Sequence, residues 1–143
     1  MARYVMRVRT EKSAEEAFAF MADLRNFPEW DPGTKSAVQV KGDGPGNGAE
    51  YDLQASGATL RYVVQDFDRP DRIVATAQNR WITSVDTITV SSDGTGSVVS
   101  YDADLVLNGF LRFADPVLKL AFNRIGGQAA DGLVKSLSGT RLS

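Results

Sequence analysis

The chain contains neither cysteine nor histidine, and these two absences exclude much of the usual chemistry of protein sites. Without cysteine there are no disulfides, thiolate nucleophiles or sulfur-ligated metals, a composition that suits the cytoplasm, where we expect the protein to reside. Without histidine there is no Ser-His-Asp or Cys-His triad and no imidazole metal ligand. Carboxylates, tyrosine, lysine and arginine are therefore the groups left for acid-base chemistry.

Strong charge and long apolar runs are missing as well. The 16 basic and 18 acidic residues give a formal net charge of -2, and neither sign forms a block. A basic footprint for nucleic acid or a polybasic membrane patch is therefore absent, and we predict no nucleic-acid partner. No window is apolar enough to span a bilayer, and residues 1–7 alternate charged and apolar side chains, which predicts a strand instead of a signal peptide. The 143 residues fit one domain, residues 1–143, large enough to tolerate an internal cavity.

The most informative pattern is near the C-terminus, where residues 115–137 predict one long amphipathic helix. Asp115 and Pro116 form a strong helix start, an N-cap carboxylate followed by the helical position that suits proline. Spacings of about three and four predict one buried stripe, made of Val117, Leu120, Ala121, Arg124, Ile125, Gln128, Leu133 and Leu137. Residues 126–127 are both glycine, at a cost of about 1 kcal/mol each in a helix interior, which predicts a kink or a close approach to the backbone.

The first part of the chain predicts a strand and two short helices. Residues 3–9 alternate arginine with apolar side chains, as in an antiparallel strand with one wet face. Ser13 and Glu16 form a capping box, and Asp23 can cap a second helical turn that we expect Pro28 to end. The predicted inward side chains of these elements are Tyr4, Met6, Val8, Ala17, Phe18, Met21 and Leu24.

The following residues predict six antiparallel strands joined by hairpins. Turn-rich breaks separate them at 42–48, 56–57, 69–71, 78–81 and 93–96. Alternation predicts that the inward side chains are Tyr51, Leu53, Ala55, Leu60, Tyr62, Val64, Val99, Tyr101, Ala103, Leu105 and Leu107. The strand 83–90 is undecided because Val85 and Ile88 fall on opposite faces. We expect Asp86 to face water, and the alternative is an inward Asp86 that would need a partner and would be a candidate base with a raised pKa. The glycine-rich segment 42–48 predicts a mobile hairpin tip, and whether it acts as a lid stays open.

These strands are the apolar partner that the sequence offers to the long helix, so the sheet is expected to curl around it and leave a hollow. The order of elements resembles the Bet v 1-like helix-grip arrangement of the START-like (SRPBCC) superfamily. Residues 17–32, AFAFMADLRNFPEWDP, resemble a recurring phrase of its polyketide cyclase/dehydrase branch, a helix-borne aromatic followed by Asp, Asn and Trp-x-Pro. Residues 93–99, DGTGSVV, resemble the hairpin before that family's last strand.

The resemblance covers essentially the whole chain. It implies an α+β helix-grip fold, in which a seven-stranded curved antiparallel sheet wraps around the C-terminal helix, with two short helices between the first and second strands. It also implies a deep cavity between sheet and helix for lipids, sterols, polyketides or other bulky apolar molecules, without specifying one reaction.

The predicted lining of this cavity is mainly apolar and aromatic. It comprises Trp30, Tyr51, Leu53, Leu60, Tyr62, Val64, Tyr101, Ala103, Leu105, Phe113, Val117, Leu120, Ala121, Arg124 and Ile125. Tyr62, Tyr101 and Arg124 offer polar groups to a ligand. Core packing is the alternative for the tyrosines, and a surface ion pair is the alternative for Arg124. Trp30 either stacks on a ligand at the mouth or seals the junction of helix and strand.

Three functional hypotheses follow. The favoured one is binding, transport or sequestration of a hydrophobic small molecule such as a lipid or polyketide, with no cofactor and no metal. The second is a polyketide cyclase or dehydrase that works through tyrosine and Arg124. For this second hypothesis, the resemblance implies an arginine on the strand 59–68 in aromatase-cyclase members, but the matching position here falls near Asp66 and Arg61 has outward parity.

The third hypothesis is a module that docks a macromolecular partner and uses the pocket little. Ligand identity and oligomeric state, monomer or dimer, stay open.

Overall fold

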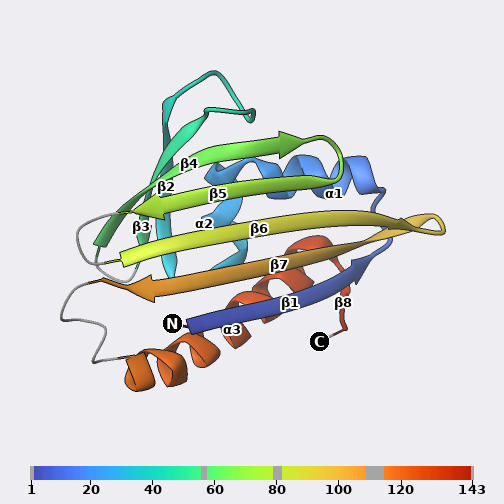
Figure 1. The fold of residues 1–143 in the computed structure, drawn as a ribbon. Coiled ribbons are helices and arrows are strands. Elements are labelled where there is room, and N and C mark those ends of the chain that lie inside the picture. Colours follow the sequence, from blue (N-terminus) through green and yellow to red (C-terminus); the bar gives the residue numbers. More distant parts are fainter. Residues whose placement is uncertain (1, 56–57, 79–81, 109–114, 143) are drawn as a thin grey trace.

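The structure is a computed structural model that describes residues 2–55, 58–78, 82–108 and 115–142 (Figure 1). Its elements, in chain order, are β1 (Ala2–Thr10), α1 (Ala14–Ala22), the 3-10 helix η1 (Leu24–Asn26), α2 (Phe27–Trp30), β2 (Thr34–Lys41), β3 (Glu50–Ala55), β4 (Ala58–Asp68), β5 (Arg72–Gln78), β6 (Ile82–Asp93), β7 (Gly96–Leu107), α3 (Asp115–Leu137) and β8 (Thr140–Arg141). The six strands after residue 33 are separated at the turn-rich breaks of the sequence.

The strands form an antiparallel sheet with the order β2-β3-β4-β5-β6-β7-β1-β8. Figure 1 shows the sheet curving over the helices, with α3 running beside β1 and with α1 and α2 on the same side of the sheet. The predicted α+β helix-grip fold is therefore confirmed. The short β8 adds one strand to the predicted seven, through the pairs Val8↔Arg141 and Arg9↔Thr140. Two residues are too short to leave a periodic signal in the sequence.

The helices between β1 and β2 begin as the capping residues predict. The Ser13 hydroxyl oxygen accepts the Glu16 amide at 3.2 Å, and the Asp23 carboxylate accepts the Arg25 amide at 3.1 Å. Pro28, by contrast, does not end a helical turn. It lies in the first turn of α2, where the missing amide N–H costs no helical hydrogen bond. The proline thus starts the turn that carries the chain to Trp30.

The buried face of the strands is largely the predicted one. Buried residues that alternation placed inward are Met6, Val8, Tyr51, Leu53, Tyr62, Val64, Val99, Tyr101 and Ala103. The exception is β6, which turns Asp86 inward and leaves it only 3% exposed, so the expectation that Asp86 faces water is wrong. The cause is the apolar end of the strand, where Ile88 and Val90 pack in the core. Because side chains repeat every second residue, burying that pair also turns Ser84 and Asp86 inward.

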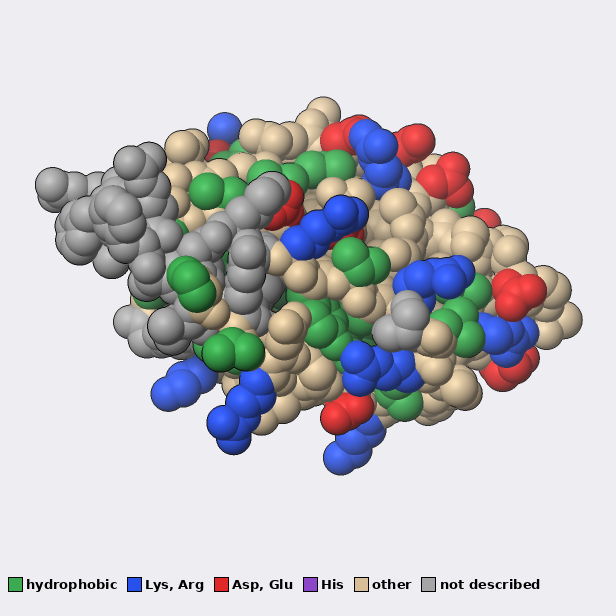
Figure 2. All heavy atoms as spheres, turned by 60° about the horizontal axis from the view of Figure 1, so that its bottom comes forward, with side chains coloured by type: hydrophobic (Ala, Val, Ile, Leu, Met, Phe, Trp, Pro, Cys, Tyr) green, Lys and Arg blue, Asp and Glu red, His purple; other side chains and the backbone are tan. Residues whose placement is uncertain are grey.

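The outer face of the sheet carries paired charges. Arg3 bonds Asp102 at 2.6 Å, and Arg61 bonds Asp52 at 2.7 Å, in each case across neighbouring strands. Such exposed pairs contribute about 0–1 kcal/mol each. On the face seen in Figure 2, basic and acidic side chains are likewise interspersed.

Helix α3 has the predicted bounds, and its buried face matches the prediction at Leu133 and Leu137 but not in the first half of the helix. Its buried positions include Gly126, Ala129, Ala130, Leu133 and Leu137. Arg124, Ala121 and Gln128 are exposed, and Leu120 is 75% exposed. The predicted stripe is not one face. Arg124 and Leu133 are nine positions apart, which is about two and a half turns of an α-helix, so they lie on opposite sides of it. Among the described residues, no helix is both long and apolar enough to cross a membrane.

Small residues determine which face of α3 meets its neighbours. A Cβ atom on Gly126 would lie 2.4 Å from Cγ of Tyr4, and one on Gly132 would lie 1.9 Å from the carbonyl oxygen of Trp30. A Cβ on Gly127 would meet nothing within 4 Å. The close approach predicted for the paired glycines thus exists at Gly126, where the helix backbone lies against the Tyr4 ring.

Candidate functional site

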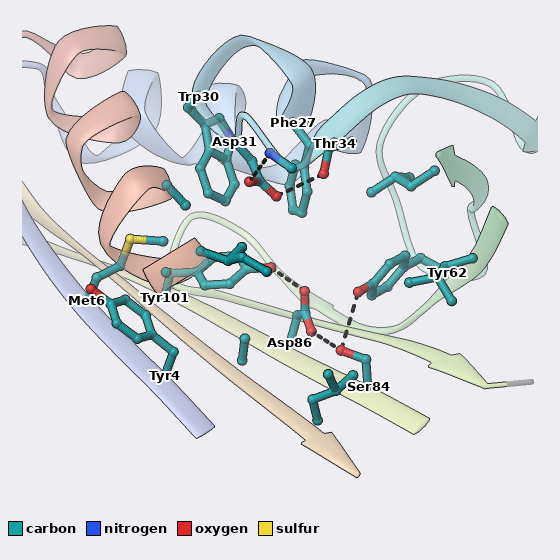
Figure 3. A pocket seen from close by; sticks show the side chains of 18 of the residues that line it. Tyr4, Met6, Phe27, Trp30, Asp31, Thr34, Tyr62, Ser84, Asp86 and Tyr101 are labelled. Carbon is teal, nitrogen blue, oxygen red and sulfur yellow. Dashed lines mark hydrogen bonds between the residues drawn. The ribbon is translucent and has the colours of Figure 1, made fainter. Parts of the chain in front are cut away.

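A cavity of about 300 Å³ lies between the concave face of the sheet and α3, within the size range of small-molecule sites (Figure 3). The residues lining it are Tyr4, Met6, Phe27, Trp30, Asp31, Gly33, Thr34, Leu53, Ala58, Leu60, Tyr62, Ile82, Ser84, Asp86, Tyr101, Ala103, Leu105, Ile125, Gly126 and Ala129. Most are aliphatic or aromatic, and none of these lining residues is lysine or arginine. The cavity therefore suits the apolar part of a ligand, and the polar side chains of its lining are confined to a few positions.

An aromatic cluster forms one wall of the cavity. The ring centroids of Phe27 and Trp30 are 4.8 Å apart, and those of Trp30 and Tyr101 are 5.2 Å apart in an edge-to-face arrangement. Trp30 is 2% exposed, and its backbone contacts Gly132 of α3. Trp30 therefore both lines the cavity and seals the junction of α2 and α3. Its indole N–H is buried without a hydrogen-bond partner among the described residues.

A polar network centred on Asp86 interrupts the apolar lining (Figure 3). The Asp86 carboxylate accepts one hydrogen bond from the Tyr101 hydroxyl and another, at 2.8 Å, from the Ser84 hydroxyl. The Tyr62 hydroxyl donates to the Ser84 oxygen at 3.3 Å. Three strands, β4, β6 and β7, thus contribute to one connected chain of hydrogen bonds inside the cavity.

Small residues on the neighbouring strands make room for this network. Asp86 pairs with Ala75 on β5 and with Ala103 on β7, so neither flanking side chain extends over the carboxylate. In the same way, Ala77 on β5 stands between Tyr62 and Ser84 in the sheet register. The short methyl group lets the tyrosine hydroxyl reach across a whole strand.

Burial raises the pKa of Asp86 from the ordinary value of 3.8 to about 6, because desolvation disfavours the charged carboxylate. The hydrogen bonds from Tyr101 and Ser84 act in the opposite direction, since they favour the charged form. Burial, together with the negative charge of Asp86, raises the pKa of Tyr62 and of Tyr101 well above 10. Both phenols therefore stay protonated, while Asp86 changes charge close to neutral pH.

Asp31 is a second carboxylate on the cavity lining. It follows α2, where its Oδ1 accepts the Gly33 amide at 2.9 Å and its Oδ2 accepts the Thr34 hydroxyl at 2.8 Å. These bonds fix the turn between α2 and β2. Asp31 also acts on Asp86 through its negative charge, which further raises the pKa of Asp86.

Comparisons with known proteins identify the family. The family described as "Polyketide cyclase / dehydrase and lipid transport" matches residues 1–138. The chain belongs to this family. The polyketide cyclase/dehydrase membership expected from the sequence is thereby confirmed. No curated protein matches the chain.

Solved structures share the fold of this polyketide cyclase/dehydrase family member at low identity. A START superfamily protein from Mycobacterium smegmatis is 16% identical, with a TM-score of 0.76 over 96% of this chain and 98% of that chain. The protein XoxI from Bacillus cereus is 17% identical, with a TM-score of 0.72 and coverage of 96% of both chains. The hypothetical protein jhp0584 from Helicobacter pylori is 11% identical, with a TM-score of 0.75 over 95% of this chain and 86% of that chain.

The structure brings about half of the predicted cavity residues together in this family member. Those that line the cavity are Trp30, Leu53, Leu60, Tyr62, Tyr101, Ala103, Leu105 and Ile125. Tyr51 and Val64 are buried but do not line it. For Tyr51 the cause is its position beside η1, near Asp23 and Arg25, where the short helices fill the space under the sheet.

Predicted residues from α3 and the segment before it are placed differently. Leu120, Ala121 and Arg124 are exposed on the face of α3 that points away from the cavity, so their assignment to the lining is wrong. Arg124 therefore cannot orient a ligand inside it. Phe113 lies outside the described residues, as does the side chain of Val117.

Sequence reasoning preferred the wrong face for the most polar part of the site, since it considered an inward Asp86 only as the alternative. The parity of β6 would have revealed Ser84 and Asp86, had the inward positions been set from Ile88 and Val90 instead of balanced against Val85. Tyr4 and Met6 were predicted to face inward but not to lie on the cavity. The side chain of Tyr4 reaches it because Gly126 leaves room for the ring.

Proposed function

We propose that this protein binds a hydrophobic small molecule, such as a lipid or polyketide, between the sheet and α3, for transport or sequestration. The observation that carries the proposal is a cavity lined mainly by aromatic and aliphatic side chains in a member of a family described by lipid transport and polyketide chemistry. In such sites apolar contact supplies most of the affinity, and a few polar groups fix orientation. Here Asp86, Tyr62 and Tyr101 have that second role.

Native mass spectrometry of protein purified from its own host tests this proposal, because a co-purifying ligand adds its mass to the protein. Ala103→Leu is the informative variant, since Ala103 lines the cavity and a larger side chain would fill part of it. Ala19→Leu is the matched control, on the exposed face of α1. We expect a bound mass in the wild type and in Ala19→Leu, and its loss in folded Ala103→Leu. A bound mass retained equally in all three would contradict a ligand in this cavity.

A second candidate is a polyketide cyclase or dehydrase, and one observation favours it. Asp86 is a buried carboxylate that lines the cavity, accepts a hydrogen bond from Tyr101 and has a pKa raised to about 6. Such a group suits general-base catalysis near neutral pH. The two arginines considered from the sequence, both among the described residues, do not reach the cavity in this version, because Arg124 is exposed and Arg61 pairs with Asp52 on the outer face.

The enzyme candidate predicts a specific kinetic signature on a polyketide-like substrate. Turnover should rise with pH around a value near 6 as Asp86 ionises, and it should be lost in Asp86→Asn. Turnover that survives Asp86→Asn with the same pH profile would exclude Asp86 as the base.

A further inference from the structure

We propose that the molecule held in this cavity carries a protonated amine, which binds at the carboxylate of Asp86. The proposal rests on the proposed ligand-binding function and specifies the polar group of the ligand. It follows from two properties of the network around Asp86, its hydrogen-bond directions and its charge.

The directions of its hydrogen bonds leave the network around Asp86 able to act only as a hydrogen-bond acceptor. An ionised carboxylate only accepts hydrogen bonds, so both Tyr101 and Ser84 must donate to Asp86. Ser84 has then used its single proton and can only accept the hydrogen bond from Tyr62. The hydroxyl protons of Tyr62, Ser84 and Tyr101 are all used in hydrogen bonds within the network. The network can therefore only accept further hydrogen bonds, through the lone pairs of its oxygens. A ligand group that meets this network must therefore bring its own hydrogen-bond donors.

The charge around the network favours a cationic donor. Asp86 is 3% exposed, and Asp31 adds a second carboxylate to the same lining. No lysine or arginine appears among the described lining residues to balance them. A buried carboxylate without a cationic partner is costly, and that cost is relieved when an opposite charge binds within hydrogen-bond distance. A primary ammonium group supplies both the charge and up to three donors.

Asp86, with its pKa raised to about 6, is faced by groups from several surrounding elements. On β4 and β7 these are Tyr62 and Tyr101, both with a pKa well above 10, and Tyr4 on β1 lines the same cavity. Asp31 approaches from the turn after α2. The cavity residues of α3 are Ile125, Gly126 and Ala129, and the pairing partner on β5 is Ala75, none of which titrates. An amine at Asp86 should therefore bind less tightly below about pH 6.

Three probes of equal chain length test the proposal on the full chain freed of bound lipid: octylamine, octanol and octanoate. Dissociation constants are measured by calorimetry at pH 7.5 for the wild type, Asp86→Asn and Asp68→Asn. Asp68 is an exposed carboxylate at the end of β4 and serves as the matched control. We expect octylamine to bind at least about tenfold more tightly than octanoate to the wild type and to Asp68→Asn, with octanol between them. Asp86→Asn should remove most of that preference.

A second measurement needs no variant. In the wild type, the affinity for octylamine should fall towards tenfold for each pH unit below about 6, while the affinity for octanol should change little. Equal binding of octanol and octylamine would overturn the cationic part of the proposal. A preference for octylamine that survives Asp86→Asn would overturn the assignment to Asp86.

The same experiment separates failure of this inference from failure of the proposed function. If the three probes bind equally and Ala103→Leu weakens all of them, the cavity binds apolar molecules but has no preference for an amine. If the probes bind equally to the wild type and Ala103→Leu, or do not bind at all, the ligand-binding function itself is contradicted and the amine proposal with it.

Discussion

Protonation of Asp86 should make the protein more stable as the pH falls from 7.5 to 5. The pKa of this carboxyl is raised to about 6 in the folded protein, against an ordinary 3.8. The folded state therefore binds the proton more tightly than the unfolded state, and the sign is the reverse of that for a salt-bridged aspartate. At pH values above 6 the buried charge costs roughly 3 kcal/mol, at about 1.4 kcal/mol for each tenfold difference in proton affinity.

The size of the effect follows from the two pKa values. Between pH 7.5 and 5 the folded protein gains on the order of 1 kcal/mol from binding this proton, because the unfolded carboxyl stays almost fully ionised over that range. Urea unfolding of ligand-free protein at both pH values measures the free energy of unfolding. The change between the two pH values is then compared with that of Asp86→Asn, which removes the titrating group.

Comparing how the free energy of unfolding changes with pH in the wild type and in Asp86→Asn cancels any effect of the asparagine that does not depend on pH. We expect the wild type to gain on the order of 1 kcal/mol more than Asp86→Asn on acidification. Asp68→Asn, a change at an exposed carboxylate, should keep the wild-type gain. Parallel pH dependences in the wild type and Asp86→Asn would refute the argument that burial holds this carboxyl at a raised pKa.

Two further predictions concern the same site and the helix that covers it. Ser84→Ala removes a hydrogen bond that lowers the pKa of Asp86, so the pH at which stability changes should move upward in the same urea experiment. Gly126→Ala should lower the free energy of unfolding by about 1–3 kcal/mol, because its Cβ would overlap the Tyr4 ring. Gly127→Ala is the matched control, with open space at the Cβ, and should raise stability by up to about 1 kcal/mol through helix propensity. Equal effects of the two glycine substitutions would contradict the close contact between α3 and β1.

Local signals in the sequence were sufficient for most of the fold. The capping residues Ser13 and Asp23 and the turn-rich breaks between the strands each depend on a few neighbouring residues, and the structure follows them. Pro28 was misread because a proline suits the first turn of a helix as well as the end of the preceding one. The two-residue strand β8 carries no periodic signal at all.

The site was harder to predict because it depends on packing between distant elements. Spacing along the helix favoured Leu120 and Arg124 for the buried side of α3, whereas the contact with Tyr4 selects the face of Gly126. Asp86 was assigned to water because it is charged, although the parity of Ile88 places it inward. At the polar centre of the cavity, the charge of the side chain predicts exposure to water, whereas the alternation of side chains along β6 predicts burial.

The central claim is that an apolar molecule occupies the space between the sheet and α3, and methyl-detected NMR during a titration with octanol tests it most directly. Ala103, Ile125 and Ala129 carry methyl groups on the cavity lining, whereas Val38 and Val40 are exposed on β2. We predict large shift changes and ligand contacts at the first three residues and none at the two valines. Changes at the valines with an unperturbed cavity would contradict the claim.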